Sequence, residues 1–323
     1  MAGLATYVVR RLLFAIPVFL AVSIITFIAM TAIGNPADLV RAGLHNPSPA
    51  QLAAIRAYFH ADEPVWTRYF FWLADFLQGN LGRSLYAGTV AGNIGPWVLT
   101  TLELQIPALL LSLAIGIPIG IYSAKHQYSK TDIAVTTTAI FGVSTPTFWL
   151  GILLIIIISG QLHLLPASGA LSGYPPYIWG SIYSDYLAHL ILPLGVLTFV
   201  SLATIVRLVR ASMLDTLRQD FILAARASGL SEGRVIYRHA LKNAITPIVT
   251  VVGLSFGTLL AGAPALETTF GWPGLGYQFV RAVGLLDLPV VQGLTIIIAI
   301  MVLAANVVTD IFYALLDPRV RLG

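Results

Sequence analysis

Long apolar segments without charge are the feature that most limits how this chain can fold. A hydrocarbon core about 30 Å thick is crossed by roughly 20 apolar residues in a helix. Six segments reach that length, and no charged residue lies between Asp132 and Asp185. Over the whole chain 57% of residues are hydrophobic and 10% are charged, whereas soluble domains have roughly 25% charged residues. The sequence therefore predicts an all-α polytopic membrane protein.

We predict six transmembrane helices with both termini in the cytoplasm. The spans are expected at residues 12–33, 99–124, 133–160, 186–206, 244–266 and 288–315. The external parts are expected at 34–98, 161–185 and 267–287, and the cytoplasmic parts at 1–11, 207–243 and 316–323. An amphipathic helix is expected in the first external part, because Ser48-Pro49-Ala50-Gln51 has the pattern of a capping box with proline at the first helical position.

The distribution of positive charge decides this orientation, because loops rich in Lys and Arg resist translocation. With the N-terminus inside, most of the 18 basic residues lie in cytoplasmic parts. The densest group lies within 207–243 and contains Arg207, Arg210, Arg218, Arg226, Arg234, Arg238 and Lys242. The inverted topology would place this group outside and is rejected. Acidic residues fall mainly in the external parts or near them, at Asp38, Asp62, Glu63, Asp75, Glu103, Asp185, Glu267 and Asp287.

Motifs for enzyme chemistry are not expected in this chain. None of the lysines follows a glycine, so the sequence contains no P-loop for ATP, and no His-Glu-x-x-His zinc motif occurs. The absence of cysteine excludes disulfides and thiolate metal sites. The pI near 9.4 comes from basic residues beside the spans, so no nucleic-acid binding is expected. We expect neither an enzyme nor a cofactor bound by this chain, and no serine nucleophile turn.

The basic segment 207–243 has the pattern of two helices joined by a tight turn. Residues 214–228 have helical composition, and Gly229 stands where a helix C-terminus needs positive φ. Ser231 is expected to cap a second helix over 232–243, with Glu232 near its positive dipole end. Such a compact pair could insert into a groove of another protein. It could equally be an ordinary juxtamembrane pair with solvated arginines.

The same segment resembles a known family. Leu223-Ala224-Ala225-Arg226-Ala227-Ser228-Gly229-Leu230-Ser231, with Arg238-His239-Ala240-Leu241-Lys242-Asn243-Ala244 after it, is similar to the coupling loop of binding-protein-dependent ABC transporter permeases. The resemblance is strongest to the first permease of dipeptide, oligopeptide and nickel importers, and it covers nearly the whole chain. Further matching motifs are Gly79-Asn80-Leu81-Gly82-Arg83-Ser84, Pro146-Thr147-Phe148-Trp149-Leu150-Gly151 and Phe270-Gly271-Trp272-Pro273-Gly274. Leu223 departs from the family, which often has a polar residue there.

The resemblance implies the permease fold of a type I ABC importer in a prokaryotic plasma membrane. Its implied partners are membrane lipid, a homologous second permease, two cytoplasmic ATPases that carry ATP and Mg, and an external solute-binding protein. Closure of the ATPase dimer would move residues 221–231 and switch the helices between inward-facing and outward-facing states. The residues expected at the ATPase contact are Phe221, Ala224, Ala225, Arg226, Gly229, Leu230 and Ser231. Peptides are the expected substrate, with nickel chelates and oligosaccharides as alternatives.

Polar and aromatic groups within spans are the candidates for the substrate path, since such groups are expensive in lipid. They are Glu103, Gln105, Trp149 and Asn306. Glu103 lies near a span end, and Asn306 could bond a neighbouring helix instead. An ion-coupled secondary transporter is the main rival, and it would need carboxylates near the midplane, which the span centres lack. A receptor or structural subunit without transport is a third alternative, and neighbouring genes for a second permease and ATPases would argue against it.

Overall fold

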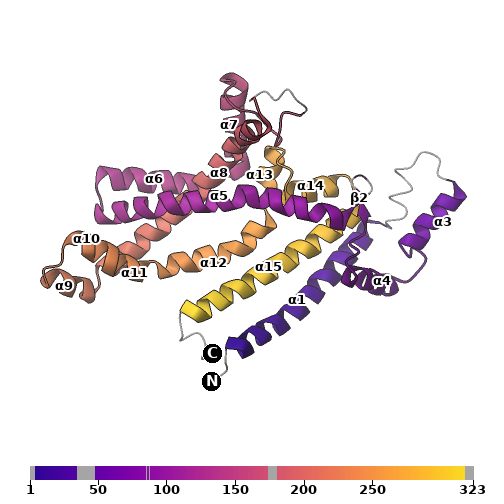
Figure 1. Cartoon of the computed structure of the whole chain (residues 1–323), viewed down its shortest axis with the longest axis horizontal. Coiled ribbons are helices and arrows are strands. Elements are labelled where there is room, and N and C mark those ends of the chain that lie inside the picture. The colour runs from indigo at the N-terminus through magenta and orange to yellow at the C-terminus, as the bar shows by residue number, and fades with distance from the viewer. Residues whose placement is uncertain (1–3, 35–47, 85, 87, 174–179, 317–323) are drawn as a thin grey trace. The chain divides into compact units, whose positions relative to one another are not determined.

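The computed structural model describes residues 4–34, 48–84, 86, 88–173 and 180–316. The described chain is almost entirely helical (Figure 1), which confirms the predicted all-α class. It forms two compact units: unit 1 is Met1–Thr100 with Gly274–Gly323, and unit 2 is Thr101–Pro273. Helix α5 (Val90–Lys125) runs from unit 1 into unit 2.

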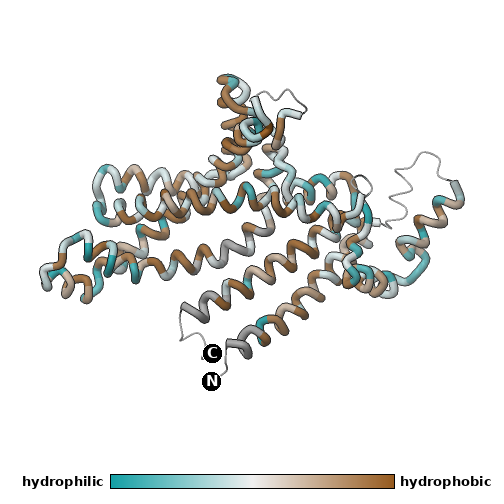
Figure 2. The backbone as a smooth tube through the Cα atoms, viewed as in Figure 1, coloured by the Kyte–Doolittle hydropathy of each residue, from teal (hydrophilic) through white to brown (hydrophobic). Residues whose placement is uncertain are grey.

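Four described helices are long and apolar enough to cross a bilayer. They are α1 (Leu4–Ile33), α5, α8 (Ile182–Leu217) and α15 (Leu288–Leu316). Hydrophobic residues run along these helices, and hydrophilic residues gather around α9 and α10 (Figure 2). A bent helix pair brings the count of possible spans to five within the described residues. The chain is therefore a multi-span membrane protein.

The helix expected over 133–160 is broken. α6 (Lys130–Ser144) ends before Pro146, and α7 (Thr147–Leu154) continues into the π-helix η1 (Ile155–Gln161) at a bend of 101°. Thr145 is extended, with φ −85° and ψ 123°, because a residue before proline is pushed out of the helical region. The pair is one broken span or a re-entrant segment, where the sequence predicted one transmembrane helix.

The helix expected over 244–266 is also shorter than predicted. α12 (Thr246–Ala261) has 16 residues and ends at Gly262, whose φ is +82°. A separate short helix, α13 (Pro264–Thr269), follows. Positive φ is natural for glycine and stops a helix cleanly. The count of six spans, and the cytoplasmic position of the termini, stay predictions.

Unit 1 is built on two long helices that pack along each other, α1 and α15. The predicted capping box is confirmed: Ser48 caps α3 (Pro49–Tyr58) with both reciprocal hydrogen bonds. α4 (Val65–Leu77) is tied to α1 by a 2.8 Å hydrogen bond between the hydroxyls of Ser23 and Tyr69. A hairpin of two short strands, β1 (Arg83–Ser84) and β2 (Gly88–Thr89), leads into α5, and α14 (Leu275–Gly284) precedes α15.

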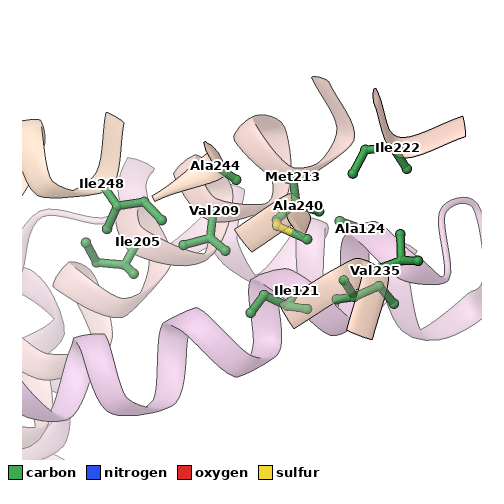
Figure 3. Packing of buried hydrophobic residues seen from close by; sticks show 11 residues of the cluster. Ile121, Ala124, Ile205, Val209, Met213, Ile222, Val235, Ala240, Ala244 and Ile248 are labelled. Atoms are coloured by element: carbon green, nitrogen blue, oxygen red, sulfur yellow. The ribbon is translucent and has the colours of Figure 1, made fainter. Parts of the chain in front are cut away.

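Unit 2 is organised around α8, against which α6 packs along its length. The C-terminal half of α8 meets the segment that the sequence predicted as helix, turn, helix. That segment forms α9 (Asp220–Ala227), α10 (Glu232–Arg234), the π-helix η2 (Val235–Ala240) and α11 (Leu241–Ala244). One buried cluster joins α9, η2, α11 and α12 to α5 and α8 (Figure 3), and it contains Ile121, Ala124, Ile205, Val209, Met213, Ile222, Val235, Ile236, Ala240, Ala244 and Ile248.

Small residues let α5 approach α8 closely. A β-carbon placed on Gly120 would lie 2.6 Å from Cβ of Val209 and 3.0 Å from the carbonyl oxygen of Val206, and one on Gly116 would lie 2.8 Å from Cγ2 of Ile205. In lipid, such close approach gives dispersion contacts that replace the missing hydrophobic driving force. The Gly116 to Gly120 spacing therefore serves helix packing.

We expect Gly120→Ala to lower stability by about 1–3 kcal/mol, as overpacking of a tight interface does. The matched control is Gly195→Ala on α8, where an added β-carbon meets no atom within 4 Å. Thermal unfolding of the purified chain in one detergent should show a lower Tm for Gly120→Ala only. Equal melting temperatures for the two variants would contradict the close approach.

Candidate functional site

The predicted coupling segment presents an apolar surface on α9. Phe221 is 43% exposed and Leu223 is 56% exposed, while Ile222 between them is fully buried in the cluster of Figure 3. Ala224 is exposed, and Ala225 packs partly against the buried cluster. One face of α9 is therefore anchored in unit 2, and the other offers uncovered apolar side chains.

The turn after α9 has the conformation expected from its glycine. Gly229 has φ +79°, and its N–H donates to the carbonyl of Arg226 at 3.0 Å. The next N–H, of Leu230, donates to the carbonyl of Ala225 at 3.4 Å, and the Leu230 side chain packs partly on the buried cluster. A β-carbon on Gly229 would meet no atom within 4 Å. The turn thus requires glycine for its φ value, and the space in front of it is empty.

Ser231 does not act as predicted. It occupies the N-cap position of α10 with φ −63° and ψ 143°, but its side chain makes no capping hydrogen bond. The two helices are tied instead by an ion pair, in which Nε of Arg226 donates to a carboxylate oxygen of Glu232 at 2.8 Å. The second helix is also divided into α10, η2 and α11, where the sequence predicted one continuous helix over 232–243.

A buried ion pair between α6 and α8 was not predicted from the sequence. Asp132 accepts bonds from Nε of Arg210 at 2.6 Å and from a terminal nitrogen of the same guanidinium at 2.9 Å. The backbone N–H of Tyr128 donates to the same carboxylate at 2.8 Å, and the Ser123 hydroxyl donates to it as well. These contacts join α5, α6 and α8. The available signal was Ser129, which caps α6 three residues before the acid.

The four predicted path residues are divided between the two units. Glu103 is exposed and accepts a hydrogen bond from the Tyr186 hydroxyl, while Gln105 is buried. Trp149 is exposed on α7. Asn306 is exposed and belongs to unit 1, whereas the other three belong to unit 2. Their role in a substrate path stays a prediction.

Three of the acidic residues assigned to the outer side are buried and hold loops in place. Asp185 accepts bonds from the backbone N–H and the hydroxyl of Ser172, at 2.7 and 2.6 Å. Glu267 accepts from the Thr101 hydroxyl at 3.1 Å. Asp287 accepts from the Ser84 hydroxyl at 2.5 Å. Their partners lie far away in sequence, except at Ser172, so no local pattern marks them.

Catalytic and metal chemistry finds no support in the described residues. A Gly-x-Ser-x-Gly pattern, which was not expected, does occur at residues 253–257, but it lies inside α12. A nucleophile elbow needs a sharp turn from a strand to a helix. Within the ranges described above, no three His, Asp or Glu side chains are grouped to hold a metal. His189 is buried and donates through Nδ1 to the carbonyl of Asp185 at 2.8 Å, as a packed histidine does.

Comparison with known proteins gives matches over the whole chain. Residues 116–322 match the family described as binding-protein-dependent transport system inner membrane component, and residues 4–89 match the N-terminal part of such components. The dipeptide transport system permease protein of Escherichia coli (strain K12) is 38% identical over 333 residues, covering 98% of each chain. The oligopeptide transport system permease protein of Bacillus subtilis (strain 168) is 37% identical over 323 residues, covering 98% of this chain and 100% of the relative.

Proposed function

Because this chain belongs to the inner-membrane components of binding-protein-dependent transport systems, we propose that it forms the translocation path for di- or oligopeptides in an ATP-driven importer. The observation that carries the substrate class is the identity to relatives named dipeptide and oligopeptide permeases, which extends over 98% of the chain. The chain is a multi-pass protein of a bacterial plasma membrane, and it has no ATPase site of its own.

The proposed partners are a homologous second permease, two cytoplasmic ATPases with ATP and Mg, and an external solute-binding protein. The ATPase contact is proposed at Phe221, Ala224, Ala225, Arg226, Gly229, Leu230 and Ser231. Support comes from α9, where Phe221 and Leu223 are uncovered in an otherwise basic segment. Apolar side chains in a polar loop are typical of a surface that a partner covers.

The proposed coupling starts from the anchored face of α9. Ile222 packs in the same buried cluster as Met213 and Val209 of α8 and Ile121 of α5. A displacement of α9 by a closing ATPase would therefore be passed to both long helices. Coupling needs different contacts in the two states of the partner and not contact alone, and the empty space before Gly229 leaves room for a close approach.

Other substrates and another transport mechanism would require different features of the importer. Nickel chelates or oligosaccharides would use the same subunit, and only the solute-binding protein would differ. An ion-coupled secondary transporter would need a carboxylate free to bind the ion. The buried carboxylates of Asp132, Asp185 and Glu267 accept hydrogen bonds within the chain, which favours structural roles for them. Asp287 accepts one through Oδ2, while its Oδ1 has no partner among the described residues.

Reconstitution in vesicles tests the proposal. The complex of both permeases and both ATPases is expected to take up a labelled dipeptide only with ATP inside and the binding protein outside. The purified single chain should hydrolyse no ATP. Uptake driven by an ion gradient without the ATPases would overturn the proposal in favour of a secondary transporter. Uptake of nickel chelates or oligosaccharides but of no peptide would overturn the substrate class alone.

A further inference from the structure

A buried guanidinium lines a cavity in unit 1. Arg68 on α4 is only 9% exposed, and its Nε finds no hydrogen-bond acceptor among the described residues. Gln292 on α15 lines the same cavity, is also 9% exposed, and has an unpartnered Nε2. Burial lowers the pKa of Arg68, yet a guanidinium stays charged at neutral pH. Two buried donors therefore line one cavity, and neither nitrogen has a hydrogen-bond partner among the described residues.

Buried donors of this kind point to an anionic ligand. An uncompensated buried charge is expensive, and buried polar groups are normally hydrogen-bonded. A carboxylate would satisfy the guanidinium with strong, charge-assisted hydrogen bonds. The cavity has about 90 Å³ of enclosed space and opens to solvent, so only the charged end of a ligand would be enclosed.

The cavity also carries an acid and aromatic rings in an ordered row. Arg68, Trp72 and Asp75 all line it, and their spacing of four and three residues places them on one face of α4. The seven residues from Arg68 to Asp75 cover about 10 Å along the helix. Phe27 lies beside Trp72, with ring centroids 6.0 Å apart, and also lines the cavity. The wall therefore offers a cation, an aromatic surface and an anion, in that order.

We propose that this cavity binds a short peptide as a zwitterion, with the free carboxylate at Arg68 and Gln292 and the ammonium group at Asp75. The aromatic rings between the two charged ends would hold a peptide side chain. A phosphatidylethanolamine headgroup has both charges but no side chain between them, so the row favours a peptide. The inference rests on the proposed function, because it places a second peptide-binding site in the part of the importer predicted to lie outside the cell.

The experiment compares two ligands on the full complex without its binding protein, in phosphatidylcholine nanodiscs. Wild type should bind glycyl-phenylalanine about tenfold or more tightly than its C-terminal amide, since a hydrogen bond to a charged group is lost. Arg68→Gln should weaken binding of the free peptide by the same factor, and amidation should then have no further effect. Arg56→Gln is the matched control, because Arg56 lies in the same external part and pairs with Asp62 on the surface.

Three outcomes would overturn the site. In the first, wild type binds the peptide and its amide equally well. In the second, wild type and Arg68→Gln bind the peptide equally well. In the third, after phosphatidylethanolamine is added to the nanodiscs, this lipid is the only ligand whose binding depends on Arg68. The comparison of the two ligands uses wild type, so it holds even where a variant folds poorly. If the same wild-type complex takes up peptide with ATP and the binding protein but shows no Arg68-dependent peptide binding, only the proposed second site is refuted. If no peptide is taken up at all, the proposed function fails.

Discussion

Gly229→Trp is expected to abolish ATP-driven uptake while the chain still folds and inserts. Positive φ costs a side-chain-bearing residue about 1–2 kcal/mol, which a membrane bundle of this size tolerates. A β-carbon at Gly229 would meet no atom within 4 Å, so the indole is not expected to displace the turn. It would instead fill the space that the proposed ATPase contact needs. We expect uptake to fall at least tenfold, with normal amounts of protein in the membrane.

Two further variants separate bulk from backbone strain. Gly229→Ala has the same unfavourable φ but little bulk, so it should keep most of the uptake. Gly173→Trp adds the same bulk at a glycine with φ +103° and no atom within 4 Å of a β-carbon, in the predicted external loop. It should leave coupling intact. The measurements are peptide uptake and co-purification of the ATPases. Full uptake by Gly229→Trp would refute the proposal that α9 contacts the ATPase.

Asp132→Ala is expected to have the largest effect on stability. Removal of one partner of a buried ion pair leaves a charge without compensation and typically costs about 3–5 kcal/mol. The side chain of Arg210 is 22% exposed, so water can reach part of the guanidinium, and we expect the lower end, about 3 kcal/mol. The loss should appear as a strongly lowered Tm and less protein in the membrane.

The control for this prediction is the exposed pair of the coupling segment. The side chains of Arg226 and Glu232 are 41% and 55% exposed, and exposed pairs contribute about 0–1 kcal/mol. Glu232→Ala should therefore shift the Tm little. Replacement of both buried partners, as Asp132→Leu with Arg210→Met, should recover part of the stability because no lone charge remains. Equal shifts for Asp132→Ala and Glu232→Ala would refute the importance of the buried pair.

Local sequence signals predicted the parts of the structure that depend on neighbouring residues. The capping box at Ser48 and the positive φ of Gly229 are confirmed, because each depends on a few adjacent positions. Proline positions were a weaker guide to where helices end. Thr145 and Ala263 precede prolines at helix breaks, whereas Pro193 lies inside α8 without ending it. Whether a proline ends a helix depends on the packing around that helix, and this packing cannot be read from a single sequence.

The contacts that sequence analysis could not find join residues far apart in the chain. Asp132 meets Arg210, Thr101 meets Glu267 and Ser84 meets Asp287. Each acid was visible, but its charge suggested only a position near a membrane surface. The cavity at Arg68 was missed for the same reason, since α1, α4 and α15 must first come together to form it.

Helix α8 sets how far a small movement can travel. Its 36 residues correspond to about 54 Å at 1.5 Å per residue. Near its start Asp185 holds the loop at Ser172, and near its end Arg210 holds α6 through Asp132. Both anchors belong to one continuous helix, so a displacement at one end would be carried along it toward the other. If the proposed ATPase contact moves the end of α8 near Arg210, we expect the loop held at Asp185 to move as well.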